Sequence, residues 1–133
     1  MIKYRKGYEI DYIRLIEMFT EAGWEEKVND YIRLSTMVEN STLVVTAWDF
    51  DYMIGFARLT YDEAGDGYIN SVVVDKEYQN SGVDKELIKQ IVSHNPNITY
   101  LLRAERLNED YYMPLGFEPD KNALIYKRKE LET

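Results

Sequence analysis

A strand, a loop, a helix and a second strand follow one another between residues 72 and 102, and this order constrains the fold of the 133-residue chain more than any other feature. Residues 72–74 are three valines, residues 82–92 carry apolar side chains on one helical face, and residues 98–102 form a short apolar run. Two strands joined through a helix pair in parallel by a right-handed crossover. The sequence therefore predicts a sheet with at least one parallel pair.

The segments before this crossover unit predict two helices and then a meander of strands. Residues 10–19 and 31–38 have apolar side chains at helical spacing, with Asp11 before the first helix and Asn29 or Asp30 before the second as cap candidates. The apolar period then changes to two, which predicts three antiparallel strands at residues 42–48, 52–61 and 68–74, with turns at 49–51 and 62–67.

The rest of the chain completes one predicted domain over residues 1–133. We expect a short helix over residues 106–113 and part of a last strand over residues 124–126. The predicted fold class is α/β, with a mixed, mostly antiparallel sheet flanked by helices.

Composition excludes several classes of function. The chain has no cysteine and one histidine, His94, so we expect no metal site, no disulfide and no cysteine nucleophile. A net charge of -8 argues against nucleic acid or an anionic membrane as a partner, because both bind basic surfaces. The sequence has no apolar run of about 18 residues, the length of a membrane span, and we expect a cytoplasmic protein.

The loop over residues 79–82 leads directly into the predicted helix, and such a loop can hold an anion. Unpaired backbone N–H groups and the positive end of the helix dipole point toward it. Ser81 can instead cap the helix, with Asp84 three residues later completing the cap. The local pattern alone leaves both interpretations open.

The wider order of segments resembles the GNAT superfamily of N-acetyltransferases over nearly the whole chain. Residues 79–84 (QNSGVD) resemble its acetyl-CoA motif Q/R-x-x-G-x-G/A, and residues 111–117 (YYMPLGF) resemble its F-Y-x-x-L-G-F signature. Residues 54–57 (IGFA) also look like the family's third strand.

The resemblance implies acetyl-CoA as co-substrate, held by the crossover unit. Its pyrophosphate would meet backbone amides of the loop, and its pantetheine arm would pair with a strand opened by a β-bulge. The amide of Val72 or Val73 would polarise the acetyl carbonyl, and Tyr112 would protonate the departing thiolate, although its ring can also simply pack. The implied cofactor-binding residues are Val72, Val73, Val74, Gln79, Asn80, Ser81, Gly82, Val83, Asp84 and Lys85.

Asp84 departs from the family pattern, which has Gly or Ala at this position. Two like charges about 4 Å apart repel by about 4 kcal/mol at an effective dielectric of 20, so the Asp84 carboxylate opposes a pyrophosphate. An acidic residue in a first helical turn also stabilises the helix by about 0.3 to 1 kcal/mol. The general base is not assigned either: Glu63, Asp75 or an ordered water are alternatives.

Residues 21–26 (EAGWEE) connect the two predicted helices, and in the family this connection borders the acceptor site. Glu21, Trp24 and Glu25 can hold an alkylammonium by charge and cation–π contact, or form a solvated helix end with Trp24 covering the core.

The predicted function is acetyl transfer to a primary amine of a small cationic molecule or a peptide N-terminus, by direct attack in a ternary complex. The alternative is an inactive binding or regulatory module that has lost acetyl-CoA binding. A homodimer is a further expectation.

Overall fold

The computed structural model describes residues 1–61, 65–103 and 109–127. The chain divides into two units, residues 1–103 and 104–133, and each unit is described by itself. Within the described ranges, no helix has the length and apolar character needed to cross a membrane.

The first unit is built on a five-stranded sheet with the order β1-β2-β3-β4-β5. Neighbours from β1 to β4 are antiparallel, whereas β5 pairs with β4 in parallel. The strands are β1 (Ile2–Lys6), β2 (Leu43–Asp49), β3 (Tyr52–Tyr61), β4 (Asp66–Val74) and β5 (Thr99–Leu102). The predicted meander and parallel pair are confirmed, and β1 is a strand that the sequence reading did not predict.

Among the described residues of this unit, three α-helices accompany the sheet: α1 (Tyr12–Glu21), α2 (Tyr31–Glu39) and α3 (Val83–Val92). The predicted caps of the first two are confirmed, because Asp11 accepts a hydrogen bond from the Arg14 amide and Asp30 from the Arg33 amide, each at 3.1 Å. Such a cap satisfies one of the amides that a helix start leaves without a partner.

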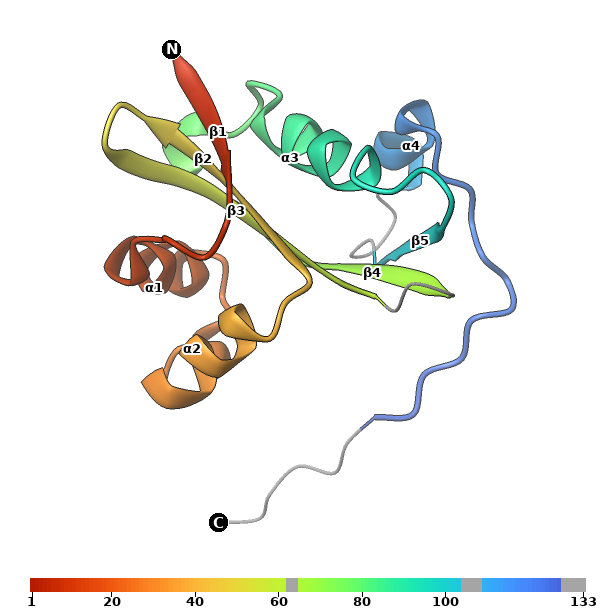
Figure 1. Ribbon diagram of the computed structural model, residues 1–133, viewed down its shortest axis with the longest axis horizontal. Helices are drawn as coiled ribbons and strands as arrows, with labels where there is room; N and C mark the ends of the chain where they lie inside the picture. The colour runs from red at the N-terminus through yellow and green to blue at the C-terminus, as the bar shows by residue number, and fades with distance from the viewer. Residues whose placement is uncertain (62–64, 104–108, 128–133) are drawn as a thin grey trace. The chain divides into compact units, whose positions relative to one another are not determined.

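The helices cover opposite faces of the sheet (Figure 1). On one face, Phe56 of β3 packs edge-to-face on Phe19 of α1 with ring centroids 5.9 Å apart. On the other face, Gly55 of β3 lies under α3, where an added Cβ would stand 3.2 Å from Leu87 and 3.3 Å from Val83. Because glycine permits this close approach, the start of α3 is held directly against the sheet.

The second unit contains α4 (Glu109–Tyr112) followed by a 3-10 turn over Met113–Leu115. The observed helix falls inside the predicted range, of which residues 106–108 lie outside the described residues. The predicted last strand over residues 124–126 is wrong, since these residues form no strand in the described chain. A strand needs a neighbour for its backbone groups, and apolar composition alone does not supply one.

Candidate functional site

The site begins at an irregularity in β4. Phe56 pairs with Val73 and Arg58 with Asn70, so β4 has one residue more than β3 between these pairs. The extra residue is accommodated at Ser71, whose φ is 59°. This is the β-bulge that the family resemblance implies, and it lies beside the predicted oxyanion amides.

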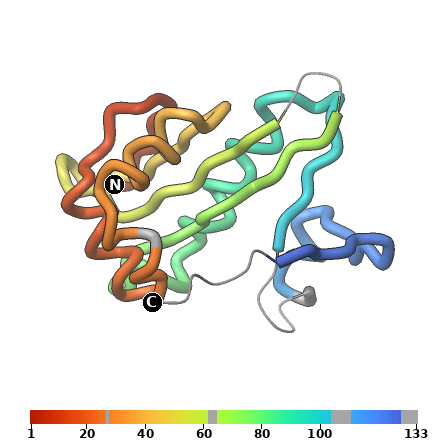
Figure 2. The backbone as a smooth tube through the Cα atoms, turned by 90° about the horizontal axis from the view of Figure 1, so that it is seen from below, coloured from red at the N-terminus to blue at the C-terminus, as the bar shows by residue number. Residues whose placement is uncertain are grey.

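The bulge coincides with the end of the parallel pairing between β4 and β5. The parallel register runs from Asp66↔Thr99 to Ile69↔Leu102 and stops there. Figure 2 shows β4 (green) and β5 (cyan) together at one end and separating toward the other. Within the described chain, residues 70–74 of β4 therefore have no partner in β5.

The loop after β4 brings the chain to the start of α3 through two left-handed residues. A 3-10 turn (Lys76–Tyr78) comes first, and then Asn80 has φ 65° and Gly82 has φ 87°. The hydrogen-bond ladder of α3 begins with Glu86 N–H donating to the Gly82 carbonyl at 3.1 Å. The amides that precede Glu86 in the helix thus belong to the helix start, where an anion is favoured.

Ser81 does not cap this helix. Its hydroxyl donates backward to the carbonyl of Tyr78, and the N-cap residue is Gly82, which makes no side-chain cap bond. The structure therefore decides against the capped-helix alternative that the sequence left open for Ser81. Gln79 also turns back, with its amide group donating to the Val74 carbonyl at 3.2 Å.

Asp84 is half-buried in the first turn of α3. Its carboxylate accepts a hydrogen bond from the Lys85 amide at 2.9 Å, so it uses one of the donors at the helix start. Burial raises the pKa of Tyr4 nearby, and the negative charges of Glu86 and Asp84 raise it further. Asp84 thus opposes an anion in two ways: its carboxylate is negatively charged, and it accepts the hydrogen bond that the Lys85 amide could give to the anion.

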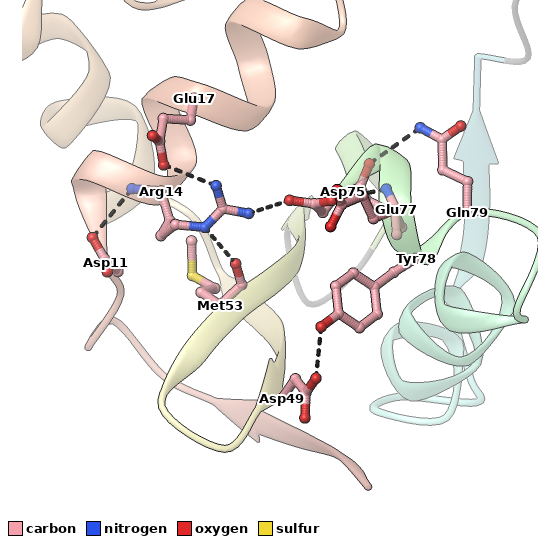
Figure 3. A network of polar contacts seen from close by, with 10 residues as sticks. Asp11, Arg14, Glu17, Asp49, Met53, Asp75, Glu77, Tyr78 and Gln79 are labelled. Atoms are coloured by element: carbon pink, nitrogen blue, oxygen red, sulfur yellow. Dashed lines mark hydrogen bonds and ion pairs between the residues drawn. The ribbon is translucent and has the colours of Figure 1, made fainter.

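A buried ion pair fixes the end of β4 (Figure 3). Asp75 follows β4 directly and its carboxylate lies 2.5 Å from the guanidinium of Arg14. Arg14 also donates to the Met53 carbonyl at 3.0 Å and to Glu17 at 2.8 Å. The second carboxylate oxygen of Asp75 accepts from the Glu77 amide at 2.9 Å. Asp75, one of the candidate general bases, therefore holds the loop in place through these contacts. Glu63, another candidate base, lies outside the described residues.

A second contact ties the 3-10 turn to the hairpin between β2 and β3. The Tyr78 hydroxyl donates to the Asp49 carboxylate at 2.6 Å. This hydrogen bond raises the pKa of Tyr78 to about 12, with burial and the charge of Asp49 adding to it. The loop that precedes α3 is thus anchored at both Asp75 and Tyr78.

The predicted acceptor residues lie at the end of α1. Trp24 is half-buried and packs edge-to-face on Phe19 at 5.3 Å, as part of the core's margin. Glu21 and Glu25 are exposed. The packing of the indole favours the alternative in which Trp24 covers the core.

Tyr112, the predicted proton donor, belongs to the second unit. It is half-buried there, with its ring centroid 5.0 Å from that of Tyr111 and 6.1 Å from that of Phe117. Both contacts lie within the segment that resembles the family signature.

Sequence reasoning missed one polar residue beside the bulge. Arg58 is half-buried in the middle of β3 and pairs with Asn70 across the sheet. Its position in the sequence could have pointed to it, because Arg58 interrupts an otherwise apolar run between Phe56 and Leu59.

A mixed sheet, a parallel pair that opens at a bulge, and a helix start beside the opening form the arrangement expected of an acetyltransferase fold. The chain belongs to the GNAT acetyltransferase family, since the family's sequence model, described as Acetyltransferase (GNAT) domain, matches residues 14–128.

Related sequences carry acetyltransferase names. GCN5-related N-acetyltransferase 2, chloroplastic, of Arabidopsis thaliana is 30% identical over 92% of this chain and 56% of its own length. Histone acetyltransferase TAP1 of Glycine max is 27% identical over 92% of this chain and 58% of its own length. The chain thus spans about half the length of the curated relatives that it matches.

Solved structures share the fold. A GNAT family acetyltransferase from Streptococcus pneumoniae superposes with a TM-score of 0.78 at 20% identity, covering 98% of this chain and 100% of that one. A predicted acetyltransferase with acetyl-CoA, from Clostridium acetobutylicum, gives 0.70 at 17% identity, covering 96% of each chain.

Proposed function

We propose that the protein transfers an acetyl group from acetyl-CoA to a primary amine, by direct attack in a ternary complex. The observation that carries this proposal is the open edge of β4 at the Ser71 bulge, which leads through a short loop to the start of α3. A thioester arm at the edge and a pyrophosphate at the helix start would be held by one continuous stretch of chain.

The loop residues fit acetyl-CoA in most respects. Gly82 takes a left-handed conformation, and a Cβ added there would meet nothing within 4 Å, so the backbone is accessible. The amides from Asn80 to Lys85 would hold the pyrophosphate, with the cation of Lys85 close by. Asp84 is the one feature of this stretch that acts against the fit, and its partly exposed carboxylate can turn away.

The chain's own groups would do the following in the reaction. Bound acetyl-CoA supplies an acyl group activated as a thioester. The amide of Val72 or Val73 would donate to the acetyl oxygen as charge develops on it. Tyr112 would deliver a proton to the departing sulfur, a role that rests on the family resemblance.

The acceptor is proposed to be a small cationic amine or a peptide N-terminus. Glu21, Trp24 and Glu25 would attract a cation by charge and by the indole face. The packing of Trp24 on Phe19 makes the two carboxylates the stronger part of this argument.

A second candidate function is a binding or regulatory module that does not hold acetyl-CoA. The observation that favours it is the hydrogen bond from the Lys85 amide to Asp84, because it occupies a donor that the pyrophosphate would use. Such a module would keep the fold and lose the transfer reaction.

Calorimetry with acetyl-CoA, followed by a thiol-release assay with primary amines, separates the two functions. Released CoA is the sole source of thiol in this assay, because the chain has no cysteine. Saturation at one hundred times the dissociation constant adds about 2.7 kcal/mol to the free energy of unfolding, so a rise in melting temperature checks binding. Thiol release that depends on an amine supports the enzyme, whereas absence of acetyl-CoA binding supports the module.

A further inference from the structure

Arg58 is a half-buried cation whose Nε has no hydrogen-bond partner among the described residues. This Nε atom itself is buried. Burial lowers the pKa of Arg58, and the neighbouring Tyr68 offsets only part of that effect. A guanidinium is costly to bury unless an anion or a set of acceptors accompanies it. Its position therefore suits a ligand that brings a negative charge.

The place of Arg58 in the sheet links it to the bulge. Two residues after Phe56 in β3, it lies on the sheet face that carries Phe56 and the core cluster. Its cross-strand partner is Asn70, the residue immediately before Ser71. The Asn70 side-chain oxygen accepts from the Ser71 hydroxyl at 3.2 Å, and the NH₂ group of Asn70 can donate to an anion.

The spacing fits an amine and a carboxylate in one small molecule. Asn70 and Val72 flank the bulged residue Ser71, so the distance between them is no more than the roughly 7 Å that two residues span along a regular strand. An acceptor nitrogen placed at the thioester beside Val72 therefore leaves a group two or three bonds away within reach of Arg58. The planar fork of a guanidinium matches a carboxylate with two parallel hydrogen bonds.

We propose that Arg58, assisted by Asn70, binds the carboxylate of the acceptor, so that the substrate is a primary amine that bears a carboxylate, as a free amino acid does. This inference rests on the proposed acetyl transfer and replaces the cationic acceptor with one that bears a carboxylate. A carboxylate site at Arg58 predicts that amines with a carboxylate are the better acceptors. The carboxylates of Glu21 and Glu25 predict the reverse, because they favour an amine without an anionic group.

The transfer itself leaves Arg58 unchanged. The neutral amine nitrogen attacks the thioester carbon, the new C–N bond forms and the C–S bond breaks. The proton lost by the nitrogen balances the one gained by the CoA sulfur. Arg58 only holds and orients the acceptor, so its loss is expected to act through substrate choice.

Matched pairs of amines test the proposal. Alanine with ethylamine, phenylalanine with phenethylamine, and lysine with cadaverine differ within each pair by the carboxylate. The thiol-release assay gives kcat/KM for each compound with wild type, Arg58→Met and Arg58→Lys. Arg33→Met, on the exposed side of α2, is the control for loss of a positive charge.

The wild type is expected to prefer the carboxylate-bearing member of at least one pair by tenfold or more. Arg58→Met is expected to lower that preference by at least tenfold. Arg58→Lys is expected to lower it by less, because the ammonium keeps the positive charge although it lacks the fork, and Arg33→Met is expected to leave it unchanged. A melting temperature of Arg58→Met at or above that of wild type would show that the variant folds and that the charge was unpaired.

Two results would overturn the proposal: a wild type that prefers the amine without the carboxylate in every pair, or an Arg58→Met variant that slows both members of each pair equally. Calorimetry with the amino acids alone measures their binding without acetyl transfer, so it tests the carboxylate site even if the protein does not transfer acetyl groups. Binding that is lost in Arg58→Met supports the carboxylate site even if no thiol is released, and absence of such binding together with absence of turnover rejects it.

Discussion

Arg14 of α1 and Asp75 at the end of β4 form an ion pair at 2.5 Å, although 61 residues separate them in the chain. Both side chains are less than one-tenth exposed, at 7% and 9%. Burial alone lowers the pKa of Arg14, but its hydrogen bonds to Glu17 and Asp75 outweigh this and the pKa is raised. The pair thus fixes the end of β4, from which the loop to α3 departs.

Replacing Arg14 by methionine is expected to destabilise the protein strongly. The change leaves the Asp75 carboxylate buried without its cation, which costs about 3 to 5 kcal/mol of unfolding free energy. Urea denaturation measures this loss. Glu17→Gln is the matched control, because Glu17 is 54% exposed and an exposed pair contributes at most about 1 kcal/mol. Equal losses for both variants would contradict the structural role assigned to Asp75.

The elements that the sequence predicted correctly are those with local signals. Asp11 and Asp30 each stand directly before an amphipathic run, and both cap a helix in the structure. The bulged strand and its crossover followed from the order of segments together with the family resemblance. Local capping and periodicity were enough for these parts because the determining residues are neighbours in sequence.

The features that escaped prediction depend on partners far away in the chain. In β1, Ile2 and Tyr4 are half-buried and the other three residues exposed, so its strand character comes from pairing with β2. The ion pair of Arg14 with Asp75 and the pairing of Arg58 with Asn70 likewise join distant segments. The expected strand at residues 124–126 failed for the converse reason, since apolar residues without a partner do not form a ladder.

Tyr78 is expected to remain protonated at a pH where ordinary tyrosines ionise. Its hydrogen bond to Asp49 raises its pKa from 10.0 to about 12. A raised pKa in the folded state means that the contact stabilises the fold fully below pH 10 and that this contribution is lost as the pH rises toward 12. The difference in tyrosinate absorbance between wild type and Tyr78→Phe measures the titration.

Asp49→Asn provides the control for this titration, because it removes the charge that holds the Tyr78 proton. Its Tyr78 is expected to titrate closer to pH 10. A Tyr78 signal near pH 10 already in the wild type would show that the hydrogen bond to Asp49 does not persist in solution.

Replacing Tyr112 by phenylalanine is expected to lower kcat for acetyl transfer by about 10² to 10⁴, as for loss of a general acid. The dissociation constant for acetyl-CoA is expected to stay the same, since the ring is retained. Tyr111→Phe, which changes the ring in contact with Tyr112, is the matched control and should keep full activity. If Tyr112→Phe is fully active, the proton reaches the sulfur by another route.

Asp84→Asn is expected to tighten acetyl-CoA binding, because it removes a negative charge from the helix start and keeps the size of the side chain. A gain of about 1.4 kcal/mol corresponds to tenfold in the dissociation constant. The same change should cost about 0.3 to 1 kcal/mol of stability, since an acid near a helix N-terminus interacts favourably with the dipole. Calorimetry and urea denaturation measure the two effects independently.

Glu86→Gln carries the same charge change two residues further along α3, where Glu86 accepts from Gln90 at 2.9 Å, and it is expected to affect binding less. Raising the ionic strength from about 0.01 to 1 M shortens the screening length from about 30 to 3 Å, so the advantage of Asp84→Asn should shrink with salt. An advantage that persists at 1 M would mean that the tighter binding does not come from repulsion by the Asp84 carboxylate. Equal binding by wild type and Asp84→Asn at low salt would show that Asp84 does not oppose the cofactor.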